Sequence, residues 1–129
     1  MAKIVIADDN HLTRKIIIKL LEKFPFPLDI EETENGRDAL RKLLDAHYDL
    51  LFLDMNMPTL SGFNVANYIK QKGEFGNLRI VVISAILEEE DITLLQDMGI
   101  KYFIIKPIDK ERFNEVVLPL IKAIEEEVV

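Results

Sequence analysis

Apolar residues along the chain follow two patterns that alternate. Short runs of β-branched and aliphatic residues recur five times, the second interrupted by acidic residues, and each precedes a segment whose apolar residues repeat every three or four positions. A short apolar run is typical of a strand covered on both faces of a sheet, and the longer repeat is typical of an amphipathic helix. The predicted strands lie at residues 3–7, 28–33, 50–53, 79–83 and 101–105.

The first predicted helix covers about residues 10–24. Asp9 or Asn10 is expected to cap its start, and Pro25 and Pro27 to end it. Its apolar residues recur at every fourth position, which predicts that together they form the buried face: Leu12, Ile16, Leu20 and Phe24.

Turn signals bound the other four helices. Asn35-Gly36 precedes the second, and Gly62 lies at the start of the third. Gly99 is the expected C-terminal cap of the fourth. The fifth begins at about Asp109, and Pro119 inside it is expected to kink it because proline removes a backbone hydrogen bond.

Strands and helices therefore alternate as (βα)₅, which predicts an α/β fold with a parallel sheet and helices on both faces. Flavodoxin-like, doubly wound sheets of this size commonly have the strand order 2-1-3-4-5, with a switch point between strands one and three. The polar strand at 28–33 fits the edge position in that order. The length of 129 residues fits one domain, residues 1–129.

Composition narrows the classes of function. The chain is 49% hydrophobic and 30% charged, as globular proteins are. Its net charge of −7 argues against a nucleic-acid surface, and the absence of cysteine excludes disulfides and thiolate metal sites. No segment approaches the roughly 20 apolar residues of a membrane span, and no signal peptide is recognisable, so we expect a cytoplasmic protein.

Polar side chains follow four of the five predicted strands. Asp8-Asp9 follow the first, Asp54 the third, Ser84 the fourth and Lys106 the fifth. The carboxyl ends of the strands at the switch point are where such sheets bind ligands. Carboxylates 4 Å apart repel by about 4 kcal/mol per pair at an effective dielectric near 20, so a cation is expected in addition to Lys106. Ligands that are all oxygen favour Mg²⁺ over zinc.

Such a site suits phosphoryl transfer. Mg²⁺ on one or two carboxylates keeps positions open for phosphate oxygens, and a carboxylate beside it can be the nucleophile that becomes an aspartyl phosphate. Lys106 and the metal would stabilise the transferring oxygens, and Ser84 would offer a hydroxyl donor. The structural alternative, with Asp8-Asp9 as a helix cap and Lys106 as a solvated strand end, explains each position singly but not all of them together.

Two other functions belong to the same fold class. A flavin phosphate would need a Ser-, Thr- or Gly-rich loop after the first strand, where this chain has Asp8-Asp9-Asn10. A phosphatase with an aspartate nucleophile would need an Asp-x-Asp pair there, and the side chains of adjacent Asp8 and Asp9 would point to opposite sides of a strand. Both remain alternatives at this point.

The whole set of motifs resembles the receiver domain of two-component response regulators, over essentially the entire chain. The start of the first helix looks most like the single-domain chemotaxis regulators. The matching elements, in order, are Asp8-Asp9, Asn35-Gly36, Asp54-Met55-Asn56-Met57-Pro58 with Gly62, Ser84-Ala85 and Lys106-Pro107.

This resemblance implies that Asp54 accepts a phosphoryl group from the phosphohistidine of a sensor histidine kinase or phosphotransfer protein. It implies a Mg²⁺ ion bound by Asp9, Asp54 and the backbone carbonyl of Asn56, with Asp8 acting through water. Lys106 would contact the phosphoryl group. Such a domain is a signalling switch rather than an enzyme, and it would be labelled slowly and stoichiometrically.

The resemblance also implies a switch. Ser84 stands at the position of the switch hydroxyl, which is more often Thr, and Phe103 stands at the aromatic position, which is often Tyr. Pro107 would follow a cis peptide bond. Phosphorylation would turn Ser84 towards the new oxygens and admit Phe103 into the space it leaves.

The fourth helix, fifth strand and fifth helix would then present a changed surface to a downstream protein target. Neither a nucleic acid nor a membrane is expected as a direct partner. A phosphorylation-dependent dimer is one alternative for the active form. A receiver belonging to a longer regulator with an effector domain is another alternative for this chain.

Overall fold

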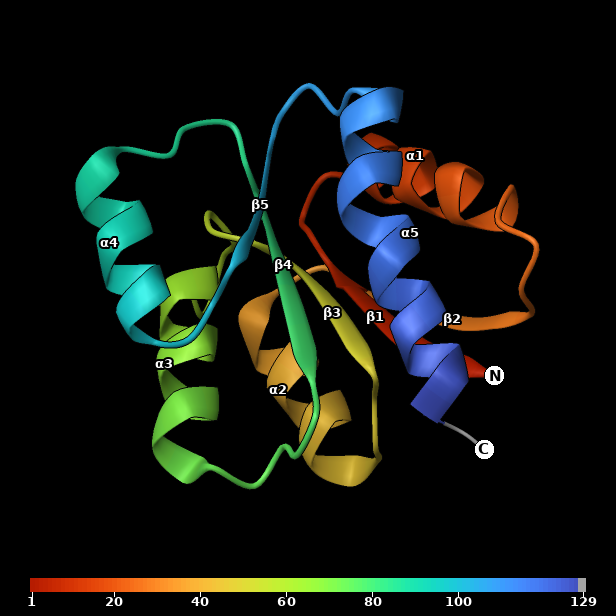
Figure 1. The fold of residues 1–129 in the computed structure, drawn as a ribbon. Coiled ribbons are helices and arrows are strands. Elements are labelled where there is room, and N and C mark those ends of the chain that lie inside the picture. Colours follow the sequence, from red (N-terminus) through yellow and green to blue (C-terminus); the bar gives the residue numbers. More distant parts are fainter. Residues whose placement is uncertain (128–129) are drawn as a thin grey trace.

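The computed structural model describes residues 1–127, in which five strands alternate with five helices (Figure 1). The strands form one sheet in the order β2-β1-β3-β4-β5, and every neighbouring pair is parallel. The predicted fold class is therefore confirmed. The elements are β1 (Ala2–Ala7), α1 (His11–Glu22), β2 (Leu28–Thr33), α2 (Gly36–Asp45), β3 (Leu50–Asp54), α3 (Gly62–Lys72), β4 (Arg79–Ser84), α4 (Glu89–Asp97), β5 (Tyr102–Ile105) and α5 (Lys110–Glu127).

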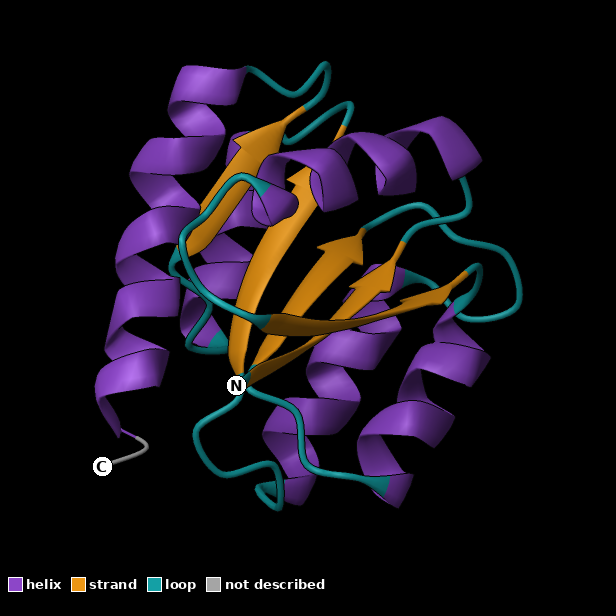
Figure 2. Ribbon diagram, turned by 90° about the vertical axis from the view of Figure 1, so that its right-hand side faces the viewer, coloured by secondary structure: helices purple, strands orange, loops and turns teal. Residues whose placement is uncertain are grey.

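Helices cover both faces of the sheet, with α1 and α5 on one face and α2, α3 and α4 on the other (Figures 1 and 2). The central strand β3 is buried along its whole length. Because side chains alternate along a strand, its Leu50 and Phe52 join the core under α1 and α5, and its Leu51 and Leu53 join the core under the other helices. This strand is the fixed centre of the fold.

The buried face of α1 differs from the prediction. Leu12 is 69% exposed and Ile16 is 46% exposed, whereas Ile17 and Leu21 are buried. A step of four residues turns a helix by about 400°, so a strict four-residue repeat drifts by about 40° per step and leaves the inner face. The expectation that Leu12 and Ile16 are core residues was therefore wrong, although Phe24 is buried as predicted.

The helix boundaries follow the predicted signals. Asn10 caps α1, because its side chain accepts a hydrogen bond from the backbone N–H of Thr13 at 3.1 Å. Gly99 follows the last turn of α4 with a φ of 88°, a left-handed conformation that suits glycine. The helix α5 continues through Pro119, and a kink there stays a prediction.

The two ends of the fold meet at the edge of the sheet where the strands begin. The backbone N–H of Ala2, at the start of β1, donates to Glu125 Oε1 near the end of α5 at 3.1 Å. In Figure 1 the first residue and the end of α5 lie close together. Among residues 1–127, no helix combines the length and the apolar character needed to cross a bilayer.

Candidate functional site

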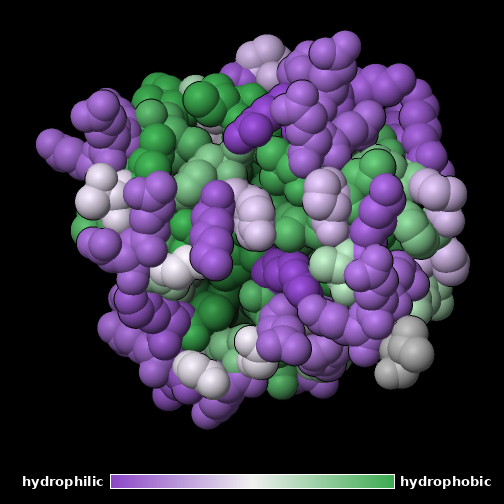
Figure 3. All heavy atoms as spheres, in the orientation of Figure 1, coloured by the Kyte–Doolittle hydropathy of each residue, from purple (hydrophilic) through white to green (hydrophobic). Residues whose placement is uncertain are grey.

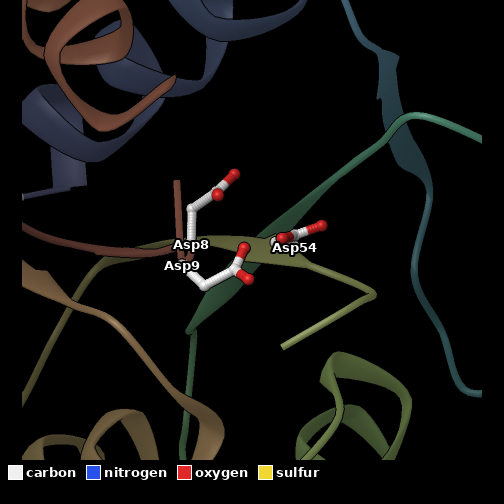
Figure 4. A group of neighbouring side chains, drawn as sticks. All are labelled: Asp8, Asp9 and Asp54. Atoms are coloured by element: carbon white, nitrogen blue, oxygen red, sulfur yellow. The ribbon is translucent and has the colours of Figure 1, made fainter. Parts of the chain in front are cut away.

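Three carboxylates meet where β1 and β3 end (Figure 4). Asp54 is the last residue of β3, and Asp8 and Asp9 directly follow β1. These two strands are neighbours, with Ala7 in register with Leu53, so their ends bring the three side chains together. Each side chain offers an oxygen within 4.8 Å of the others. The structure therefore joins all three predicted carboxylates in one cluster.

Lys106 is the cation closest to this cluster. Its Nζ lies 3.0 Å from Asp8 Oδ2 and 3.6 Å from Asp54 Oδ2, and its own side chain is only 21% exposed. The backbone N–H of Lys106 donates to the carbonyl of Ser84, which extends the pairing of β5 with β4 up to the site. One ammonium group facing three carboxylates leaves an excess of negative charge at the end of the sheet.

The electrostatics of Asp54 reflect this excess. Burial, followed by the charge of Asp8, raises the pKa of Asp54 to about 6, and Lys106 and the backbone N–H of Asn56 only partly oppose that rise. Asp54 and Asp8 are 3% and 1% exposed. Two carboxylates this deeply buried are stabilised either by a proton or by further positive charge.

Asp8 has one carboxylate oxygen that, among the residues the structure describes, has an ion pair but no hydrogen bond. Its Oδ2 lies near Lys106 Nζ but outside hydrogen-bonding geometry, and within residues 1–127 no hydrogen bond reaches this buried oxygen. Buried polar atoms nearly always have a hydrogen-bond partner, so an oxygen held only by its ion pair with Lys106 can accept a further ligand. A hard divalent cation such as Mg²⁺ fits a set of oxygen ligands with one such atom.

Ser84 and Phe103 lie beside the cluster on β4 and β5. Ser84 is fully buried, and its hydroxyl donates to the carbonyl of Ile86 at 2.8 Å. Phe103 pairs with Val82, two residues before Ser84, so Ser84 and Phe103 face the same side of the sheet. Phe103 is only partly buried, against the core under α3 and α4. The peptide bond between Lys106 and Pro107 is cis.

Two glycines of the predicted motifs hold the loop after Asp54. A Cβ on Gly62 would lie 2.1 Å from the carbonyl oxygen of Asp54, and a Cβ on Gly36 would lie 2.0 Å from that of Leu60. Neither position has room for a side chain, because contacts between backbones bring α2 and α3 against the loop. Close packing of α2 and α3 therefore restricts the backbone from Asp54 to Leu60.

Sequence reasoning missed two features of the site. Thr59, in the loop after Asp54, has a φ of 71°, which is rare for a β-branched residue. Arg14 on α1 is 5% exposed, and its Nη1 donates to the carbonyl of Asp8 at 2.7 Å. Nothing in the local sequence indicated either feature, because the burial of Arg14 depends on its contacts with Asp8 and with β2, and no turn motif marks Thr59.

Comparison with known proteins now identifies the class. The family model of the response regulator receiver domain matches residues 4–118, so the chain belongs to this family. It is a receiver domain of two-component phosphorelay signalling, and the resemblance seen in its motifs is confirmed.

Individual relatives differ in how much of their length they share with this chain. The polar-differentiation response regulator DivK of Brucella ovis is 27% identical over 88% of this chain and 91% of its own length. The hybrid signal transduction histidine kinase L of Dictyostelium discoideum is 30% identical over 91% of this chain, which spans only 7% of that kinase. A solved structure, the REC domain of the response regulator AraT from Geobacillus stearothermophilus, has a TM-score of 0.82 and 28% identity, and covers 99% of this chain and 98% of its own.

Proposed function

We propose that Asp54 accepts the phosphoryl group, from the phosphohistidine of a sensor histidine kinase or phosphotransfer protein. The observation that carries this assignment is the cluster of Asp8, Asp9 and Asp54 with Lys106 Nζ 3.6 Å from Asp54 Oδ2. Asp54 is the last residue of β3, which is buried along its whole length. A phosphoryl group on Asp54 would therefore place negative charge next to buried residues. We place this role in the cytoplasm.

The residues would hold Mg²⁺ through Asp9, Asp54 and the backbone carbonyl of Asn56, with Asp8 acting through water. When bound, the ion neutralises charge on the oxygens of the transferring group. An oxygen of Asp54 forms the new bond to phosphorus while the bond from phosphorus to the imidazole nitrogen breaks, and that nitrogen keeps the electron pair. Lys106 stabilises the added negative charge. With a pKa of about 6, Asp54 is mostly ionised at pH 7 and able to attack.

The docking of a donor is supported by the two apolar residues that α1 exposes. Leu12 and Ile16 lie one turn apart on the helix that begins directly after Asp8 and Asp9. Exposed apolar residues grouped beside a site are typical of a protein–protein contact. We therefore assign this face of α1 to contact with the donor protein.

The output would use the other side of the site. Phosphorylation adds about two negative charges. The hydroxyl of Ser84 would leave the carbonyl of Ile86 for the new oxygens, and the partly buried Phe103 would move into the space released.

The surface of α4, β5 and α5 would change with this movement and recruit a downstream protein. Three apolar side chains are exposed around this surface, Ile86, Leu94 and Ile105. Figure 3 shows apolar surface over the loop between β4 and α4, next to hydrophilic side chains. Residues 88–129 carry eleven acidic and five basic side chains, so the complementary partner is a protein with a basic and apolar surface rather than a nucleic acid.

The decisive test is labelling with a small phosphodonor such as acetyl phosphate in the presence of Mg²⁺, measured by intact mass. The wild-type chain is expected to gain one phosphoryl group, and Asp54→Asn none. Labelling of Asp54→Asn at the wild-type level would overturn the assignment. Multiple turnover of phosphomonoesters would favour the aspartate phosphatase instead, and a bound chromophore absorbing near the flavin maximum would favour the flavin module.

A second measurement tests the switch. Beryllofluoride with Mg²⁺ imitates the aspartyl phosphate, and it is expected to shift the NMR signals of Phe103 and of α4 and β5. Unchanged signals there, with the acid site clearly occupied, would exclude the proposed movement. A single domain of residues 1–129 and a receiver within a longer regulator are both expected to show these shifts.

A further inference from the structure

Arg14 connects the end of β1 to the end of the edge strand β2. Its Nη1 donates to the carbonyl oxygen of Asp8 at 2.7 Å, and its Nε donates to Glu32 Oε1 at 3.0 Å. Its Nη2 lies 3.6 Å from Glu34 Oε1. Arg14 is only 5% exposed, and its planar guanidinium group bonds to both strands at once.

The acceptor of Arg14 is a peptide group of the acid site itself. The carbonyl of Asp8 belongs to the peptide that joins Asp8 to Asp9, and a peptide group is planar. Fixing its oxygen therefore fixes the direction in which the chain enters Asp9. The Asp8 carboxylate has supports of its own, since it accepts from the backbone N–H of Asn10 at 2.8 Å and faces Lys106. The exposed carboxylate of Asp9 depends on the backbone that carries it.

We propose that Arg14 is a positioning residue for the divalent cation, which sets the Asp8–Asp9 peptide and thereby aims Asp9 at the space between Asp8 and Asp54. Glu32 in turn holds Arg14, so the end of the edge strand contributes to the site without touching the ion. This inference rests on the proposed function, because it concerns the affinity of the same carboxylates for Mg²⁺.

Positioning and simple charge predict effects of opposite sign. If Arg14 acted only as a nearby positive charge, its removal would strengthen the binding of a cation. If it positions Asp9, its removal weakens binding, because groups that orient metal ligands typically change metal affinity by about 10-fold to 100-fold. The direction of the change therefore distinguishes the two roles.

The experiment is a titration of the full chain with Mg²⁺ alone, followed by the backbone NMR signals of Asp9, Asn10 and Asn56 and checked by calorimetry. Arg14→Met and Arg14→Lys are compared with the wild-type chain. Lysine keeps the charge but cannot donate to Asp8 and Glu32 with the same planar fork. The matched control is Arg41→Met, which removes a charge from an exposed arginine of α2 that pairs with Asp38.

We expect both Arg14 variants to bind Mg²⁺ about tenfold more weakly than the wild-type chain, and Arg41→Met to bind it at least as tightly. Glu32→Gln, which leaves Arg14 in place, is expected to lose less and provides the test if the Arg14 variants do not fold. Wild-type or tighter affinity in folded Arg14→Met, or in Glu32→Gln when neither Arg14 variant folds, would overturn the proposal. A wild-type chain without measurable Mg²⁺ affinity would instead contradict the proposed function itself.

Discussion

Two clusters of charged side chains lie on opposite sides of β1, and they are balanced in opposite ways. At the edge of the sheet, Glu31 accepts hydrogen bonds from the Tyr48 hydroxyl at 2.7 Å and from Lys42 Nζ at 2.9 Å, with Lys3 Nζ 3.9 Å away. These bonds, that from Tyr48 first, lower the pKa of Glu31. At the acid site, Lys106 pairs with Asp8 and Asp54 in a cluster of three carboxylates, and the pKa of Asp54 is raised.

The difference separates a cluster whose charges are compensated within the chain from one that keeps an excess of negative charge. Glu31 has partners within the chain in Lys42, Lys3 and the Tyr48 hydroxyl. Burial and the bond to Glu31 raise the pKa of Tyr48, so its hydroxyl stays a donor at neutral pH. Within residues 1–127, the acid site keeps a buried oxygen, Asp8 Oδ2, that has an ion pair but no hydrogen bond, and it keeps an excess of negative charge. Shifted pKa values of that kind gather at functional sites, because the fold leaves the compensation to a ligand.

Removing the cation of the acid site should have the largest effect. Lys106→Met lacks the ammonium group that is proposed to stabilise the negative charge on the phosphoryl oxygens. We expect the rate of labelling by acetyl phosphate to fall about 100-fold, as for loss of one preorganised donor in other transfer reactions. Lys42→Met, which removes a cation from the Glu31 cluster, is the matched control and should label at the wild-type rate. Equal rates in both variants would show that the clusters do not differ in function.

The second-largest effect is expected in how the stability of the fold depends on pH, where the two clusters should differ. The folded pKa of Asp54, about 6, exceeds the ordinary value of about 4, so the folded state binds more protons between these pH values and loses stability as the pH rises from 4 to 6. The free energy of unfolding of Asp54→Asn should therefore exceed that of the wild-type chain by about 3 kcal/mol at pH 7, and should not exceed it near pH 4. Urea unfolding at both pH values, without divalent cations, measures this. A loss of stability in Asp54→Asn at pH 7 would contradict the raised pKa.

The cluster of Glu31 should respond with the opposite sign. Because the pKa of Glu31 is lowered, its contribution is complete above the ordinary pKa of a glutamate and is lost as the pH falls through the lowered value. Tyr48→Phe removes the strongest of its hydrogen bonds and should cost about 1 kcal/mol of unfolding free energy at pH 7. The labelling rate should not change, and a slower rate would mean that this edge of the sheet also supports the acid site.

The smallest expected effect concerns the backbone of Thr59. Thr59 holds a left-handed conformation in the loop after Asp54. Thr59→Gly removes that strain and should raise the free energy of unfolding by about 0.5–1 kcal/mol, while Thr59→Ala keeps the φ requirement and should gain little. Thermal unfolding of the two variants measures the difference. A destabilised Thr59→Gly would show that the threonine side chain contributes more than its backbone costs.

The sequence predicted the features that depend on local pattern and on parallel topology. Period and alternation indicated every strand, and the strand order common to doubly wound sheets of this size placed Asp8 and Asp9 beside Asp54. The face of α1 was misjudged at Leu12 and Ile16, because exposed apolar residues and core residues look alike in a helical repeat.

Arg14 and Thr59 were missed for a different reason. The role of Arg14 depends on its hydrogen bonds to the carbonyl of Asp8 and to β2, which follows later in the chain. Thr59 lies in a loop against which α2 and α3 pack closely. Neither relation has a period or a motif. The metal ligands and the switch residues stay predictions, since their roles appear only when the ion or the phosphoryl group is bound.

The contact between the backbone of Ala2 and Glu125 has a consequence for how this domain can be joined to others. Both ends of the fold emerge at the edge where the strands begin, and Asp54 lies at the edge where they finish. A fused partner, a fluorescent tag or a tether to a surface would therefore start a full strand length away from the acid site. Such a domain can be inserted into a longer polypeptide as a cassette, with its chemistry facing away from its host.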